Sequence, residues 1–428
     1  MQDWAKRYLR YPAAPVDLVL DGVLFPRDTL KATLRKTLQD RAAADTIRRI
    51  HLIAEETELL RSIISPLIVN CDGIRSSSVE SIIIWSDHSD RPVDISDFFA
   101  HYRFPKMRSL ELVNCTISSW DLITSRTSAL TILDLYFEDP TPNPTTAQLL
   151  SILSSNPRLR MVRLTGCTVP GDGGGMSSPR VPLHHLEELN LSGNFRGIVK
   201  LLHCLDHAQN TVITLCLRGG VVGDISRILG PYLRDYLRHR GSSPNGVDLS
   251  IFRADRRITL DVGDGHEVHP DSKPSLMTIM VFLSQSPPDN LLQKAILDLV
   301  AGTPRGEIIS FRAGGNTVVM EDLYAHLPNL RTLYLTKVAL STALPKAADE
   351  DILPSLQHVF FSGLVVEHSD WGPLTEFVSR RASSGNKLAS LTIAGSSYMR
   401  PEVAEGIRGM VGEFTAECLD VDSPSDSR

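Results

Sequence analysis

The chain has 428 residues, of which 42% are hydrophobic, so it can build a substantial core and is too apolar to be disordered. Its formal net charge is −6, from 44 basic and 50 acidic residues, which argues against a protein that acts chiefly on the nucleic-acid backbone. No apolar run reaches the roughly 18–20 residues of a membrane helix, so we expect neither nucleic acid nor a membrane as a partner.

The amino terminus and the cysteines indicate an intracellular chain, either cytoplasmic or nuclear. Residues 1–7 contain no apolar segment of the kind that a secretory signal needs. The six cysteines are scattered and form no C-x-x-C pair, which is typical of a protein in a reducing compartment.

Residues 1–46 are predicted to cap the amino-terminal end of the fold. Residues 17–20 alternate like a strand, and residues 27–44 place Leu30, Leu34 and Leu38 on one stripe of a helix.

The clearest motif of the chain is the sequence LEELNLSGN at residues 186–194, which fits the leucine-rich-repeat pattern L-x-x-L-x-L-x-x-N. Leu189 and Leu191 alternate, so both point to one side of a short strand. Asn194 is expected to satisfy backbone groups of the neighbouring turn. One such unit cannot bury its apolar side alone, so copies of it must stack.

Copies of this pattern are found along most of the chain. With the one at residue 186, the copies start at residues 47, 79, 107, 130, 159, 186 and 212, and again at 330, 356 and 388, and within each run the steps are about 23 to 32 residues. These steps leave room for outer helices, which are predicted over residues 119–123, 145–155, 195–207, 224–240, 320–326 and 371–381. The sequence therefore predicts one elongated α/β leucine-rich-repeat solenoid with irregular repeats, a curved parallel sheet on the concave side and helices on the convex side.

Two stretches interrupt the repeats. Residues 169–182 are rich in glycine and proline and predict a surface insertion. In the second stretch, residues 247–251 and 258–262 predict a hairpin, residues 276–283 a helix, and residues 295–299 a strand that rejoins the sheet. The predicted organisation is a cap (1–46), repeats (47–240), an atypical insertion with hairpin and helix (241–316), further repeats (317–419) and a disordered tail (420–428).

Several segments carry a resemblance to a known family. They are Trp4, the strand at residues 14–20, the connection LLSILSSNPRL at residues 149–159, and the hairpin at residues 247–262. Together they resemble the leucine-rich-repeat region of fungal F-box-like proteins, particularly the large mushroom family. In that family an F-box ahead of the first strand docks on the adaptor of a cullin-type ubiquitin ligase, while the repeats hold the substrate. No F-box fits ahead of Trp4 here, so the resemblance covers the repeat region only.

Residues that could carry chemistry have plain structural interpretations. Cys115 and Cys167 occupy the Asn/Cys position of the repeat and are expected to be small buried residues. The spacing of a polar cluster matches no known calcium or zinc motif, which favours an exposed loop; its members are Asp261, Asp264, His266, Glu267 and His269. The glycine run at residues 171–175 lacks the ending of a phosphate-binding loop. We expect no catalytic residue, no metal and no cofactor, and we expect the chain not to be an enzyme.

The strongest functional prediction is a surface. In each copy the residues between the leucine positions face the concave side, and several are tyrosine, arginine or methionine, which protein interfaces favour. The predicted partner-binding residues are Glu111, Asp134, Tyr136, Met161, Arg163, Glu188, Asn190, Arg218, Tyr334, His358 and Phe360.

The sequence thus predicts a monomer that binds a protein without catalysis, as the substrate-recognition part of an F-box-type ubiquitin ligase. A cullin-ligase adaptor would be a second partner if an F-box exists upstream. Two alternatives stay open. One is a stand-alone interaction scaffold without ligase duty, and the other is a GTPase-activating or inhibitor-type repeat protein, although no arginine is singled out as a catalytic finger.

Overall fold

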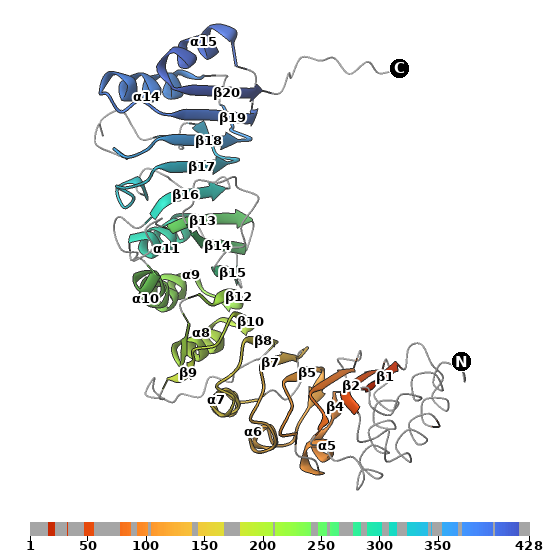
Figure 1. The fold of residues 1–428 in the computed structure, drawn as a ribbon. Helices are drawn as coiled ribbons and strands as arrows, with labels where there is room; N and C mark the ends of the chain where they lie inside the picture. Colours follow the sequence, from red (N-terminus) through yellow and green to blue (C-terminus); the bar gives the residue numbers. More distant parts are fainter. Residues whose placement is uncertain are drawn as a thin grey trace. The chain divides into compact units, whose positions relative to one another are not determined.

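The computed structural model (Figure 1) describes most of the chain, in two compact units, Met1–Ile213 and Thr214–Arg428. The described residues are 16–21, 32, 47–54, 78–86, 92–101, 104–138, 144–166, 180–208, 210–240, 247–254, 257–264, 277–283, 289–301, 308–314, 323–340, 344, 353–366, 370–396 and 399–418.

The first unit is built on a parallel sheet with the strand order β1-β2-β3-β5-β7-β8-β10. Its strands are β1 (Val16–Asp21), β2 (Ile47–Ala54), β3 (Ser81–Ser86), β5 (Ser109–Val113), β7 (Ile132–Tyr136), β8 (Met161–Thr165) and β10 (Glu188–Asn194). All of the copies predicted in this unit are therefore strands, in chain order. Spatial order follows chain order because each coil stacks on the one before it.

Strand side chains alternate between a buried and an uncovered face. In β5, Leu110 and Leu112 are fully buried, while Glu111 between them is not. The buried face meets the helices of the coils, which are α5 (Ser96–His101), α6 (Asp121–Arg126), α7 (Thr146–Ser155) and α8 (Phe195–His203). Figure 1 shows α5, α6 and α7 side by side on one side of the strands.

Two short parallel pairs form separate two-stranded sheets. They are β4 (Val93–Asp94) with β6 (Cys115–Thr116), and β9 (Val181–Leu183) with β11 (Leu205–His207). The predicted helix over residues 195–207 therefore ends at His203 and is followed by β11.

The role predicted for Asn194 is wrong. Asn194 is exposed, and its Oδ1 caps α8 by accepting bonds from the backbone N–H groups of Arg196 and Gly197. The role of bonding to backbone groups of the neighbouring coils, which we call the ladder role, belongs to Asn114. It is buried, and its backbone is left-handed with φ 53°. Its Nδ2 donates to the Ser86 carbonyl at 3.1 Å, and its Oδ1 accepts from the Glu138 N–H at 3.0 Å. Asn114 thereby links three successive coils.

Cys115 is the small buried residue that the sequence predicts. It is fully buried, and its thiol donates to the carbonyl oxygens of Ile84 and Val113 at 3.6 and 3.3 Å. Burial raises the pKa of this thiol, so it has no thiolate character at neutral pH.

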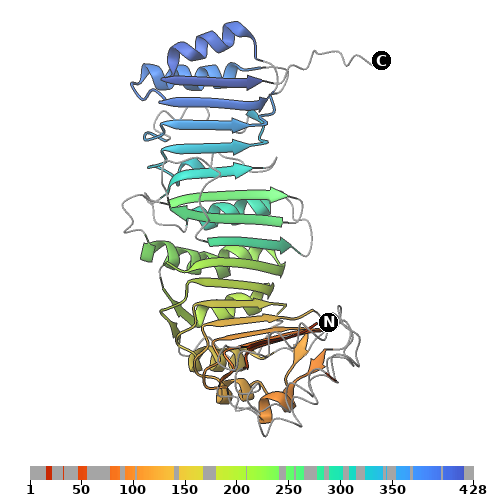
Figure 2. The same ribbon diagram turned by 45° about the vertical axis from the view of Figure 1, so that its right-hand side comes forward.

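The second unit contains the strands β13 (Val247–Ala254), β14 (Arg257–Asp264), β15 (Met277–Leu283), β16 (Ile308–Gly314), β17 (Thr332–Thr336), β18 (His358–Ser362), β19 (Ser390–Ser396) and β20 (Glu413–Cys418). Their order is β15-β14-β13-β16-β17-β18-β19-β20. The predicted hairpin is confirmed as β13 and β14, which pair antiparallel. The pairs β13–β16, β16–β17, β17–β18, β18–β19 and β19–β20 are parallel, and Figure 2 shows these strands stacked on one another.

Two predictions in this unit are wrong. Residues 276–283 are predicted as a helix, but Met277–Leu283 is strand β15, antiparallel to β14. Residues 295–299 are predicted as a strand, but they lie inside the helix α11 (Asp289–Ala301). A short apolar run fits either structure by periodicity, so only its partners decide. Here β14 offers an open edge to β15, and α11 packs on α9 and η2.

The remaining helices follow the prediction closely. The helix expected over residues 224–240 is α9 (Val222–Asp224), the π-helix η2 (Ile225–Leu229) and α10 (Gly230–Arg240). The helix expected over residues 371–381 is α14 (Gly372–Ser383), which packs on α15 (Pro401–Met410). Of the predicted helix at residues 320–326, only Leu323 and Tyr324 are described as helical.

Strand β12 (Val212–Gly220), a predicted copy, includes residues of both units. Each unit thus has the predicted leucine-rich-repeat architecture, with parallel strands whose buried face meets helices. Several predictions lie outside the described residues: the helix at 27–44 apart from Ala32, the insertion at 169–179, Cys167, residues 265–269 and the tail from 420. Among the described residues, no helix is long and apolar enough to cross a membrane.

Candidate partner-binding surfaces

The predicted partner-binding residues all lie on the strand face that is not packed against helices. Tyr136 and Arg218 are exposed, and the other nine are half-buried: Glu111, Asp134, Met161, Arg163, Glu188, Asn190, Tyr334, His358 and Phe360. The alternation of each strand places them there, because their sequence neighbours are the buried apolar residues of the core. The structure brings them together in two groups, one in each unit, while Arg218 lies near the end of β12.

The first group lies across four neighbouring strands of the first unit. Glu111 of β5 is in register with Asp134 of β7, which is in register with Arg163 of β8, and this with Asn190 of β10. Glu188 lies two residues before Asn190 on the same face. We call this set the unit 1 face, together with the aromatic residues Trp85 and Tyr136 at its margin.

Arg163 is the centre of the hydrogen bonding on the unit 1 face. Its Nε donates to Glu188 Oε1 at 3.0 Å, and its guanidinium also lies 3.7 Å from Asp134 Oδ2. The Asn190 amide donates to the same Glu188 oxygen at 2.7 Å. These side chains hold one another in place, so the surface is ordered before any partner arrives.

The unit 1 face has more negative than positive charge. Glu111, Asp134 and Glu188 supply three carboxylates against the one guanidinium of Arg163. Burial raises the pKa of Asp134 above its ordinary value, the Glu111 carboxylate raises it further, and Arg163 opposes both effects. Asp134 therefore carries its charge in an unfavourable environment, which a partner's cation would improve.

Aromatic side chains border these charges. Trp85 of β3 is 42% exposed, and its indole Nε1 donates to Glu111 Oε1 at 3.0 Å. Tyr136 of β7 is 36% exposed. Sequence reasoning missed Trp85, because the predicted copy of the repeat ends at Ile84. The alternation itself contained the signal, since Trp85 continues the uncovered positions of that strand.

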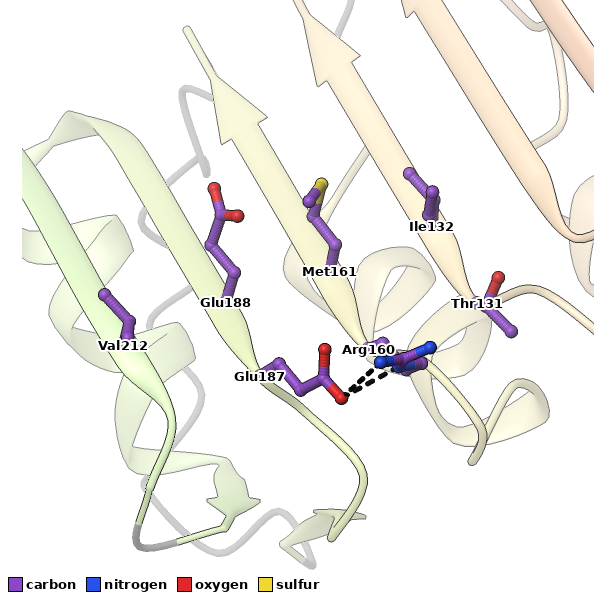
Figure 3. Close-up of a pocket in the computed structure, with 7 residues that line it drawn as sticks. All are labelled: Thr131, Ile132, Arg160, Met161, Glu187, Glu188 and Val212. Carbon is purple, nitrogen blue, oxygen red and sulfur yellow. Dashed lines mark hydrogen bonds and ion pairs between the residues drawn. The ribbon is translucent and has the colours of Figure 1, made fainter.

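A pocket of about 400 Å³ lies where three strands of the first unit begin (Figure 3). Its lining comes from the residues before and at the start of β7, β8 and β10 and from the start of β12: Thr131, Ile132, Arg160, Met161, Glu187, Glu188 and Val212. Arg160 and Glu187 form an ion pair at 2.7 Å at one side of it. Its apolar side chains, Ile132, Met161 and Val212, give a place for a partner's apolar group beside the charged row.

The second group lies on β16, β17 and β18 of the second unit. Arg312, Tyr334 and Phe360 are in register on the uncovered face. The guanidinium carbon of Arg312 lies 4.9 Å from the centre of the Tyr334 ring, and the Tyr334 and Phe360 rings are 5.6 Å apart. His358 is a partner of Ser390 on the next strand, with Nδ1 2.9 Å from the hydroxyl oxygen. We call Arg312, Tyr334, His358 and Phe360 the unit 2 face.

Sequence reasoning missed Arg312, because strand β16 was assigned to the atypical insertion. The alternation of Phe311 and Ala313 around Arg312 was the available signal. Asp261, from the polar cluster of the sequence, accepts a hydrogen bond from Thr278 at 2.6 Å. Among the residues that the structure describes, no three His, Cys, Asp or Glu side chains are placed to hold a metal ion.

The two units are therefore α/β leucine-rich-repeat coils with an uncovered strand face. No protein-family model and no curated protein matches the chain. Among solved structures, a chain of the "Crystal structure of TLR13-ssRNA13 complex" is similar, with 12% identity and a TM-score of 0.32, over 87% of this chain and 56% of that one. The chain thus spans little more than half the length of this neighbour, and the fold class rests on the strands and helices described above.

Proposed function

We propose that this chain is a non-catalytic, protein-binding leucine-rich-repeat protein whose uncovered strand faces hold the partner. The observation that carries the proposal is the ordered row of Glu111, Asp134, Arg163 and Glu188, bordered by Trp85 and Tyr136. Tryptophan, tyrosine and arginine are enriched at protein interfaces, and the prearranged carboxylates beside them would select a partner of complementary charge.

The charge balance of the unit 1 face gives the polarity of its partner. A lysine or arginine of the partner placed near Glu111 and Asp134 would offset the excess of carboxylates. Such charge complementarity raises the association rate and selects among partners. An apolar residue next to that cation would reach the pocket at Ile132 and Met161.

The finer proposal is that this binding serves substrate recognition in an F-box-type ubiquitin ligase. Two segments that carry the family resemblance have the expected structure: the first strand β1, and the hairpin of β13 and β14. The connection through α7, Asn156 and Pro157 also leads directly into the next strand. Co-purification of the native, full-length gene product with a cullin and its adaptor tests this point, and absence of both favours a stand-alone scaffold.

The binding proposal is tested with a photo-crosslinking amino acid at matched serine positions. Ser192 of β10 and Ser362 of β18 lie on the uncovered strand faces, whereas Ser154 of α7 and Ser379 of α14 are exposed on helices. We expect the strand positions to crosslink one protein reproducibly in cells and the helix positions not to do so. Crosslinking of that protein from the helix positions alone would contradict the proposal.

A further inference from the structure

We propose that the unit 2 face binds an acidic segment of a protein partner, with a carboxylate paired to Arg312 and an apolar side chain packed on Tyr334 and Phe360. This inference rests on the proposed protein-binding function and adds the chemistry of the partner at a second surface.

Arg312 has hydrogen-bond donors that no carboxylate of the described residues uses. It lies on β16 between Ser250 of β13 and Tyr334 of β17, both of which are uncharged. Its Nε–H is buried and has no hydrogen-bond partner, and no carboxylate of the described residues pairs with its guanidinium. An arginine whose donors have no carboxylate partner gains free energy when a ligand accepts hydrogen bonds from its terminal N–H groups.

The orientation of the guanidinium favours a carboxylate. The guanidinium carbon lies over the Tyr334 ring, 4.9 Å from the ring centre. This cation–π contact holds the guanidinium and leaves its terminal N–H groups to form bonds, in the fork that matches the two oxygens of a carboxylate. The same contact lowers the side-chain entropy that binding would otherwise cost.

The charge pattern of this surface points to a protein rather than a nucleic acid. Within the described strands β16, β17, β18 and β19, Arg312 is the only lysine or arginine. Binding to a polyanion uses several cations that neutralise successive phosphates. The single cation of Arg312 fits one carboxylate of a partner segment, and the other contacts of that segment would not be ionic.

The aromatic pair next to Arg312 supplies those other contacts. Tyr334 and Phe360 are both half-buried, and their rings meet at 5.6 Å with a tilt of 48°. Phe360 is followed in register by Thr392, a small residue that leaves the ring accessible. The partner segment that fits this surface is an aspartate or glutamate with a large apolar residue beside it.

The test uses a random peptide library displayed on phage and selected against the full-length chain. Peptides recovered on the native chain should be enriched in aspartate or glutamate next to a large apolar residue. A synthetic copy of the best peptide, measured by fluorescence anisotropy, should bind Arg312→Gln about tenfold more weakly. Arg331→Gln is the matched control, because Arg331 is an exposed arginine just before β17 and should leave the affinity unchanged.

Further arms separate the alternatives. A glutamate-to-glutamine change in the peptide should weaken binding to the native chain about tenfold and have little effect on Arg312→Gln. The Arg312→Lys variant, which keeps the charge and loses the fork, should bind with intermediate affinity. Unfolding curves of each variant, superimposable with that of the native chain, establish that affinity and not folding has changed.

Each contrary result has a distinct meaning. Peptides without acidic enrichment, or equal affinity for Arg312→Gln, overturn this inference and leave the proposed function standing. If a phosphoserine peptide binds more tightly than the glutamate peptide, the anion that pairs with Arg312 is a phosphate, and the proposal of a carboxylate is overturned. Arg312-dependent binding of a fluorescent oligothymidylate overturns the protein partner, and failure to enrich any peptide counts against both proposals.

Discussion

Arg163 is the residue on which the order of the unit 1 face depends. It is the one cation among the carboxylates of Glu111, Asp134 and Glu188, and 42% of its side chain remains exposed. Glutamine at this position would leave the carboxylates to repel one another across adjacent strands.

We therefore expect Arg163→Gln to lower the free energy of unfolding by about 1 kcal/mol at neutral pH. Denaturant titration measures this change. Arg160→Gln is the control, because the pair of Arg160 with Glu187 is 61% and 56% exposed and its loss should cost less than about 0.5 kcal/mol. Equal costs for the two variants would show that Arg163 has no special role.

Asp134 gives the pH dependence of this surface. Its folded-state pKa lies above the ordinary 3.8 because of burial first and Glu111 second. The folded state then binds the proton more tightly than the unfolded state, so the contribution of Asp134 to stability is full below pH 3.8 and is lost as pH rises through the folded pKa.

Asparagine at position 134 mimics the protonated form of Asp134. We therefore expect the free energy of unfolding of Asp134→Asn, compared with that of the native chain, to be most favourable at pH 7. This advantage should shrink as pH falls toward 3.8. Denaturant titrations of both proteins across this pH range measure it. An advantage that grows on acidification would mean that Arg163 outweighs burial and Glu111.

At this scale the sequence predicts which residues face outward but not what each one does. The alternation alone placed Glu111, Asp134 and Arg163 on one face. Their hydrogen bonds depend on the register between strands far apart in the sequence, which the pattern does not contain. The pattern also does not show which asparagine bonds to a neighbouring coil. Asn194 occupies the motif position but caps helix α8, whereas Asn114 bonds to the neighbouring coil.

The two asparagines differ in the elements that they hold together. Asn114 is buried and bonds to backbone groups of the coils before and after its own, whereas Asn194 caps the exposed start of α8. We expect Asn114→Ala to cost about 2 to 3 kcal/mol, from two buried groups left unpaired. Asn194→Ala should cost about 1 kcal/mol. Thermal or chemical unfolding ranks the two, and the reverse order would contradict the assignment of the ladder to Asn114.

Gly166, just after β8, marks a close approach between neighbouring coils. It has φ +72°, and a Cβ there would lie 1.7 Å from the Phe137 carbonyl oxygen. Gly166→Ala should therefore destabilise the fold by about 3 kcal/mol or more.

Gly385 is the control that separates the cost of the positive φ from the cost of the close contact. It also has a positive φ, of +80°, but nothing lies within 4 Å of its Cβ position, so Gly385→Ala should cost only about 1 kcal/mol of backbone strain. Unfolding curves measure both variants. A similar loss for the two would show that the coils can move apart at Gly166.

Elements were predictable where the leucine spacing was regular. Every predicted repeat strand is observed, because apolar alternation after a fixed interval has one meaning in a stacked coil. Strands β15 and β16 and helix α11 were not recognised, since they lie outside the regular leucine spacing. Strand β15 belongs to a local antiparallel arrangement, whereas β16 returns to parallel pairing. There the neighbouring strand, rather than the local sequence, decides the structure.

On the scale of the whole molecule, each unit offers an uncovered face of different chemistry. The unit 1 face has an excess of carboxylates and an apolar pocket, whereas the unit 2 face has one arginine over the Tyr334 ring, which in turn contacts Phe360. Both faces lie on strands, so the proposed binding at either one takes place through the strands.

The most direct measurement of this claim is the affinity of the purified, crosslinked partner for two sets of alanine variants. One set replaces Arg163, Tyr334 and Phe360 on the strand faces, and the other replaces Ser154 and Ser379 on the helices. The account predicts a loss of at least about tenfold for the strand set and none for the helix set, with folding verified for both. An unchanged affinity for the strand set would contradict it.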